Sequence, residues 1–176
     1  MAAAAGPPSN VSAQSTPVLL PPEAGGHLVY CTPFNRVIAL DPQTGRERWS
    51  YDPQVRRTSE RPYRCRGVAY AAESRKDAGG ACQHRVFSVT GDRRLIALDA
   101  RDGRPCAGFG EDGTVTLAER DRFGLEEVGA SSPPAVANGV VVVGSSVIDF
   151  AYAEAPRGIV AAYDAATGAP RWSFDP

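Results

Sequence analysis

The chain has few of the residues that build metal centres and nucleic-acid surfaces. Its 176 residues include four cysteines, two histidines and one methionine, and 19 basic and 20 acidic residues leave a formal charge of −1. The cysteines lack C-x-x-C spacing and the two histidines complete no zinc pattern, so we expect no structural zinc. Without a basic stripe or an acidic tail, neither nucleic acid nor a highly charged partner is expected.

Long apolar runs are also absent, which argues against a membrane span. Residues 1–26 are rich in Ala, Pro, Gly and Ser, contain no Lys or Arg, and have Val18–Leu20 as their apolar cluster. This segment resembles neither a signal peptide nor a transmembrane helix. We expect residues 1–26 to form a poorly ordered leader or the worn edge of a truncated blade, with sheet structure beginning at His27.

One segment occurs three times, and it is the strongest indication of the fold. Each copy runs from an apolar strand into Asp and a Gly turn, and the copies are Val37–Trp49, Leu95–Gly103 and Val160–Trp172. The Asp side chain stabilises the turn and the Gly adopts a positive φ, so each copy predicts a β-hairpin. A single hairpin cannot bury its own apolar face, and repeated hairpins must therefore pack on one another.

Composition and spacing favour an all-β fold. The 18 Gly and 15 Pro residues suit many short strands and tight turns. The copies lie further apart than the roughly 40–50 residues of a propeller blade, so the excess is assigned to loops at residues 53–83 and 108–133. Two copies end in tryptophan, and we expect Trp49 and Trp172 to occupy equivalent buried positions between blades.

The cysteines are Cys31, Cys65, Cys82 and Cys106. One interpretation treats all four as small buried apolar residues that stay reduced. The other pairs them, and four cysteines allow three connectivities. Of the possible pairs we expect Cys65 with Cys82, because that bond would clamp the charged excursion between the first two repeats.

Several motifs together resemble the pyrroloquinoline quinone (PQQ) dehydrogenases, in particular the membrane-bound glucose, quinate and shikimate dehydrogenases. They are the repeat A-x-D-x-x-T-G-x-x-x-W and the segments Cys65–Tyr70, Arg94–Asp99, Ser132–Pro134 and Val143–Asp149. The resemblance implies that residues 27–176 form two to three four-stranded antiparallel blades of an eight-bladed propeller. It also implies PQQ and calcium at the mouth of the central channel, and a chain that is an incomplete part of the ring.

The resemblance assigns four site residues. Arg66 matches an arginine that meets a PQQ carboxylate, and its planar fork suits that contact. Ser132 and Ser146 match hydroxyl positions that line the cofactor. Asp149 matches a calcium ligand, which agrees with the preference of calcium for oxygen donors. The chain departs from the glucose branch at Ala71, where that branch has His, and at Phe150, where it has Asn.

Two classes of function follow from the resemblance. In the first, the chain is part of an oxidoreductase that oxidises a sugar or polyol with PQQ and passes electrons to ubiquinone. The resemblance implies a periplasmic location for this domain. The family's catalytic residues would lie beyond Pro176, so we expect the isolated chain to be inactive. In the second, the repeats build a non-enzymatic scaffold that binds a partner protein. The set of Arg66, Ser132, Ser146 and Asp149 favours the enzyme, because a scaffold needs no such group.

Overall fold

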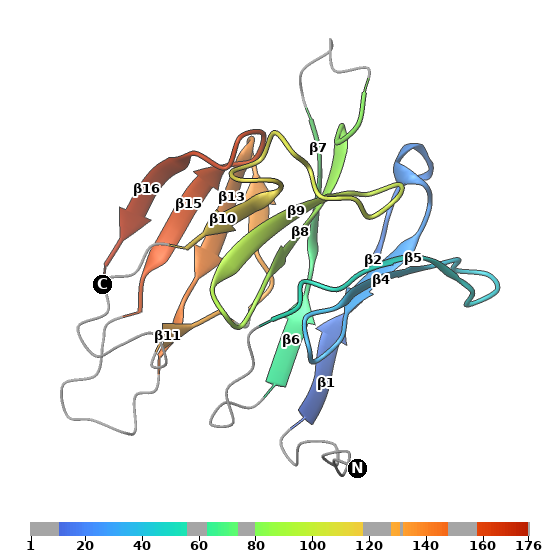
Figure 1. Cartoon of the computed structure of the whole chain (residues 1–176), viewed down its shortest axis with the longest axis horizontal. Helices are drawn as coiled ribbons and strands as arrows, with labels where there is room; N and C mark the ends of the chain where they lie inside the picture. Colours follow the sequence, from blue (N-terminus) through green and yellow to red (C-terminus); the bar gives the residue numbers. More distant parts are fainter. Residues whose placement is uncertain are drawn as a thin grey trace, which may run out of the picture.

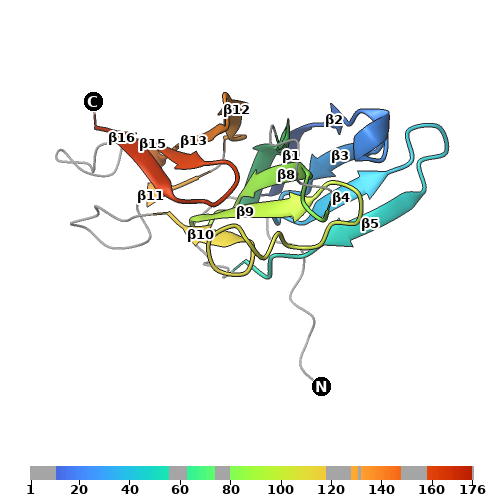
Figure 2. The same ribbon diagram turned by 90° about the horizontal axis from the view of Figure 1, so that it is seen from above.

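The computed structural model describes residues 11–55, 63–73, 80–117, 128–130, 132–147 and 158–175. These residues form three four-stranded antiparallel sheets, here called blades 1, 2 and 3 (Figure 1). The sheets fan out from one another, with β2 and β12 on one side of the fan and β5 and β10 on the other (Figure 2). The all-β, multi-blade prediction is confirmed.

In each blade the strands pair in chain order, apart from the separate strand β14. Blade 1 contains β2 (Val18–Leu19), β3 (Leu28–Cys31), β4 (Val37–Leu40) and β5 (Glu47–Tyr51). Blade 2 contains β7 (Ala69–Ala72), β8 (His84–Val89), β9 (Arg94–Asp99) and β10 (Thr114–Thr116). Blade 3 contains β12 (Ala135–Ala137), β13 (Val140–Gly144), β15 (Val160–Asp164) and β16 (Pro170–Phe174).

Two short ribbons and one turn of 3₁₀ helix lie outside the blade sheets. Strand β1 (Val11–Thr16) pairs in parallel with β6 (Tyr63–Gly67), and β11 (Val128–Gly129) pairs with β14 (Ser146–Val147). The 3₁₀ turn spans Pro22–Ala24. The start of sheet structure expected at His27 is therefore wrong, because β1 and β2 precede it. Residues 1–10 of the expected leader lie outside the described residues.

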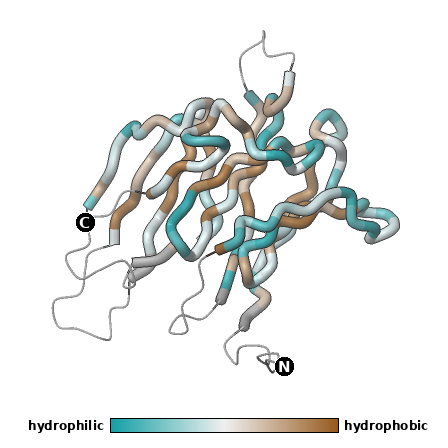
Figure 3. The backbone as a smooth tube through the Cα atoms, viewed as in Figure 1, coloured by the Kyte–Doolittle hydropathy of each residue, from teal (hydrophilic) through white to brown (hydrophobic). Residues whose placement is uncertain are grey.

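Blade 2 is buried on both faces, which explains its almost continuous apolar strands. Successive side chains of a strand point to opposite faces. Val86 accordingly joins the core between blades 1 and 2, whereas Phe87 joins the core between blades 2 and 3. Figure 3 shows hydrophobic residues along these strands and hydrophilic residues at the outer turns.

The three predicted turns are confirmed, and each is closed by a hydrogen bond from a glycine amide to an aspartate carbonyl. The bonds join Gly45 to Asp41 at 2.9 Å, Gly103 to Asp99 at 2.9 Å and Gly168 to Asp164 at 2.8 Å. The three glycines have φ angles of 68°, 75° and 75°. Residues other than glycine rarely adopt these φ angles, which is why the repeat needs Gly at this position.

The carboxylate at the third turn makes the stability of the turn depend on pH. Burial raises the pKa of Asp164, but hydrogen bonds from Arg171 and Thr167 outweigh it and lower the pKa from 3.8 to about 2. A lowered pKa stabilises the fold fully above pH 3.8 and loses that effect as the pH falls through about 2. We expect urea unfolding to show this loss between pH 4.5 and pH 2, and Asp164→Asn to remove this part of the acid dependence. An identical acid dependence in both proteins would contradict it.

Trp49 docks on the turn of the next blade, as predicted for both tryptophans. Its side chain is 8% exposed, and its indole N–H donates to the Ala100 carbonyl at 3.2 Å. A Cβ at Gly103 would lie 2.4 Å from the Trp49 ring, so this turn glycine also provides space for the indole.

Trp172 has the equivalent position in its hairpin, but the prediction that it is buried is wrong. It lies opposite Ala162, as Trp49 lies opposite Ala39. Its side chain is 49% exposed because β16 is the outer strand of blade 3 and no described blade follows it. In the second repeat, which lacks the tryptophan, Phe109 and Val115 pack against Gly168 instead.

The cysteines form two disulfides, Cys31–Cys65 and Cys82–Cys106. The expected Cys65–Cys82 pair is therefore wrong, and so is the interpretation that all four stay reduced. Cys65 lies in β6, which packs beside β3, where Cys31 is located. Cys106 donates its amide to Ala97 of β9, which brings it to the segment just before β8 that contains Cys82.

Candidate cofactor site

Strand β6 presents Arg66, and its backbone is fixed from two sides. It pairs with β1, and the Cys31–Cys65 disulfide joins it to β3 of blade 1. Cys65 is 3% exposed, whereas Arg66, the next residue, is exposed. The site that the resemblance predicts therefore begins on a strand that a covalent bond holds to the blade core.

Within the described part of the chain, Arg66 makes one side-chain contact, and it is to a neutral group. Its Nε donates to the Gln14 side-chain oxygen at 3.3 Å. Among the residues that the structure describes, no carboxylate forms an ion pair with it. The two terminal nitrogens of a guanidinium have the planar arrangement that a carboxylate can bind.

The segment containing Ser132 contacts strand β6 through Pro133, the residue after Ser132. A Cβ at Gly67 would lie 3.4 Å from Pro133 Cβ and Cγ, so the residue after Arg66 packs against the residue after Ser132. Ser132 is exposed. Two of the predicted site segments, far apart in the sequence, therefore meet at this point.

The other predicted residues are less well defined. Ser146 lies in β14, opposite Gly129 of β11. Asp149 and Phe150 lie outside the described residues, so the calcium assignment stays a prediction. Across the part of the chain that is described, no group of three or more His, Cys, Asp or Glu could hold a metal ion. Ala71 lies in β7 and packs against the core between blades 2 and 3.

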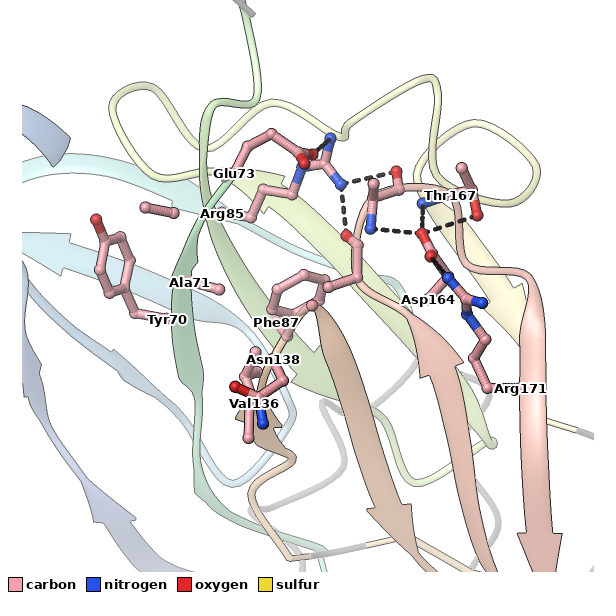
Figure 4. A pocket seen from close by; sticks show the side chains of 15 residues that line it. Tyr70, Ala71, Glu73, Arg85, Phe87, Val136, Asn138, Asp164, Thr167 and Arg171 are labelled. Carbon is pink, nitrogen blue, oxygen red and sulfur yellow. Dashed lines mark hydrogen bonds and ion pairs between the residues drawn. The ribbon is translucent and has the colours of Figure 1, made fainter. Parts of the chain in front are cut away.

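A cavity of about 540 Å³ lies between blades 2 and 3, beside the C-terminal end of β7 (Figure 4). Arg85 crosses it, donating to the carbonyls of Ala165 at 2.5 Å and Ala166 at 2.7 Å and pairing with Glu73 at 3.5 Å. Burial lowers the pKa of Arg85, and the carboxylate of Glu73 opposes that shift. These partners satisfy the Arg85 charge, so the contacts join two blades and leave no free charge there for a ligand.

We expect the disulfide beside Arg66 to hold β6 in place. Replacing both Cys31 and Cys65 with serine should lower the free energy of unfolding by about 3 kcal/mol, because the bond closes a long loop in the unfolded chain. Hydrogen exchange should also become faster at the β6 amides. The matched control, with Cys82 and Cys106 replaced, should lose stability while the β6 amides stay protected. Equal exchange at β6 in the two variants would show that the bond does not fix this strand.

The sequence analysis missed two residues of this ribbon, Arg64 and Gln14. Arg64 lies two positions before Arg66 on the same strand, and its Nε atom is buried without a hydrogen-bond partner. The signal was present as Arg-x-Arg within a strand, since alternate residues share a face. Gln14 could not be found in this way because its contact with Arg66 joins residues far apart in the sequence.

The whole chain, residues 1–176, matches the family described as "PQQ: Glucose/ethanol/alcohol dehydrogenase, beta-propeller domain". It is 37% identical to the glycerol dehydrogenase large subunit of Gluconobacter oxydans, over 93% of this chain and 22% of that protein. It is 35% identical to the quinate/shikimate dehydrogenase (quinone) of Acinetobacter baylyi, over 90% of this chain and 21% of that protein. The chain thus spans about a fifth of the length of these curated relatives.

A solved structure agrees with the sequence matches. The quinohemoprotein alcohol dehydrogenase from Comamonas testosteroni superposes with a TM-score of 0.71 at 27% identity, over 96% of this chain and 22% of that chain. Over the residues described here, no helix is long and apolar enough to cross a membrane.

Proposed function

The chain belongs to the β-propeller domain family of the PQQ-dependent glucose, ethanol and alcohol dehydrogenases, and from this membership we propose that it forms one side of a PQQ site. The complete enzyme would oxidise a sugar or polyol of the glucose, quinate or glycerol type. Calcium at the cofactor, ubiquinone as electron acceptor and a periplasmic location are parts of the same proposal. The curated relatives are named as glycerol and quinone-linked quinate/shikimate dehydrogenases.

The observation that carries the proposal is the state of Arg66. It is exposed, no described carboxylate forms an ion pair with it, and it lies on a strand that the Cys31–Cys65 disulfide fixes. A guanidinium held in this way suits a cofactor that carries three carboxylates, because the contact is charge-assisted and needs little ordering.

Each residue of the proposed site has a separate role. Arg66 binds and orients a carboxylate of the cofactor, and the hydroxyls of Ser132 and Ser146 donate hydrogen bonds to it. Asp149 supplies a carboxylate ligand to calcium. PQQ itself, when bound, supplies the redox chemistry by accepting two electrons from the alcohol carbon. Ala71 contributes neither an imidazole donor nor a stacking surface, so cofactor contacts at β7 differ from those of the glucose branch.

A chimeric enzyme tests the proposal. Residues 1–176 would replace the matching segment of the Gluconobacter glycerol dehydrogenase large subunit, and PQQ-dependent reduction of a dye would be measured with glycerol, quinate and glucose. We expect activity that requires added PQQ, and roughly a tenfold higher PQQ concentration for half-maximal activity with Arg66→Gln.

The matched control for the chimera is Arg104→Gln. The Arg104 side chain is 85% exposed and pairs with its neighbour Asp102 at 3.6 Å. This variant should need no more PQQ than the parent chimera. A folded chimera without PQQ-dependent activity, or an Arg66→Gln variant with unchanged PQQ requirement, would count against the proposed site.

A further inference from the structure

Strand β6 carries two arginines on one face. Side chains alternate along a strand, so Arg64 and Arg66 share the face opposite to Cys65. Cys65 is bonded to Cys31 and buried against blade 1. Residues two apart in a strand lie roughly 7 Å from each other. The ribbon of β1 and β6 therefore presents two guanidinium groups away from the blade core.

Arg64 differs from Arg85 and Arg94, the other partly buried arginines that the structure describes. Its Nε atom is buried and has no hydrogen-bond partner. Arg85 and Arg94, in contrast, pair with Glu73 and Asp92 and also donate to backbone carbonyls. A buried donor without an acceptor costs free energy, and a ligand would meet Arg64 through its terminal nitrogens, because the Nε atom itself is covered.

Neighbouring charge does not neutralise the two arginines. Within the described ranges, no ion pair involves Arg64 or Arg66, and the Arg66 contact with Gln14 is to a neutral amide. Two like charges on adjacent same-face positions repel each other, and a ligand with two negative groups would relieve this repulsion. A single chloride or monocarboxylate would satisfy one guanidinium and leave the other.

We propose that Arg64 is a second carboxylate-binding residue, so that Arg64 and Arg66 together bind two carboxylates of one polycarboxylate ligand. The inference rests on the proposed function, in which this ligand is PQQ. It extends that function because the resemblance assigns the contact to Arg66 alone. A quinate-type substrate has a single carboxylate and could meet only one of the two guanidinium groups, and the experiment separates it from PQQ.

The test is an NMR titration of the ¹⁵N-labelled chain of 176 residues with PQQ alone, followed at the arginine Nε–H signals. We expect the signals of Arg64 and Arg66 to shift along one binding curve. Arg64→Gln should weaken PQQ binding about three- to tenfold, as should Arg66→Gln, because each removes one charge-assisted contact. Arg104→Gln, which removes a charge elsewhere, should leave the binding curve unchanged.

The outcomes separate this inference from the proposed function. If Arg66 shifts and Arg64 does not, the inference fails and the Arg66 contact stands. If neither signal shifts in the folded chain at millimolar PQQ, the inference fails, and the proposed function is then judged by the chimera. If quinate binds at Arg64 as tightly as PQQ does, the claim that one ligand bridges both arginines is overturned.

Discussion

Replacing Trp49 with alanine should lower the free energy of unfolding by about 4 kcal/mol, which is typical of a large buried aromatic. The side chain is 8% exposed and belongs to the core between blades 1 and 2. The substitution also removes the hydrogen bond to the Ala100 carbonyl and leaves a cavity beside Gly103. Because these contacts join two blades, the loss should appear as weaker coupling between blades 1 and 2.

Trp172→Ala is the matched control for this prediction. It removes the same side chain from the equivalent position of the third repeat, but that indole is 49% exposed. Its cost should be about 2 kcal/mol, roughly half that of Trp49→Ala, because about half of its surface already contacts water. Urea unfolding of both variants measures the difference. Equal losses would show that neither the deeper burial of Trp49 nor its docking contact on Gly103 adds to stability.

Local features of the fold could be predicted from the sequence, and contacts between distant residues could not. The Asp-to-Gly turns were predicted because the side-chain oxygen and the positive φ belong to a few neighbouring residues. Strand β2 was missed because it has two residues and is defined by its pairing with β3. The disulfides were assigned wrongly because their partners depend on how β6 packs beside β3.

The candidate site shows the same division. The resemblance identified Arg66, and the structure adds its partner Gln14 and its neighbour Arg64, neither of which a motif marks.

Gly103 shows how one residue can have a local and a distant role. Its φ of 75° is a requirement of the turn, whereas its contact with Trp49 is a requirement of blade packing. Sequence reasoning found the first role and missed the second.

The chain by itself should bind PQQ weakly, even with calcium present. It spans about a fifth of the length of its curated relatives, so a ring like theirs needs further blades. The groups proposed to meet the cofactor are Arg64, Arg66, Ser132, Ser146 and Asp149. Arg66 and Ser132 are exposed. Water therefore competes for these groups, and charge-assisted contacts lose the strength that a dry, preorganised site gives them.

We expect titration calorimetry of the isolated chain with PQQ and calcium to give a Kd of about 1 mM or weaker, near −4 kcal/mol. Glucose, quinate and ethanol should reduce no artificial electron acceptor in its presence, because no opposite wall positions a substrate against the cofactor. Asp149→Ala is the decisive variant, since it removes the proposed calcium ligand. If the chain instead bound PQQ at micromolar concentration with calcium, and Asp149→Ala abolished that binding, these blades would form a self-sufficient cofactor module. The need for an opposite wall would then be disproved, and Asp149 would be established as the residue through which calcium acts.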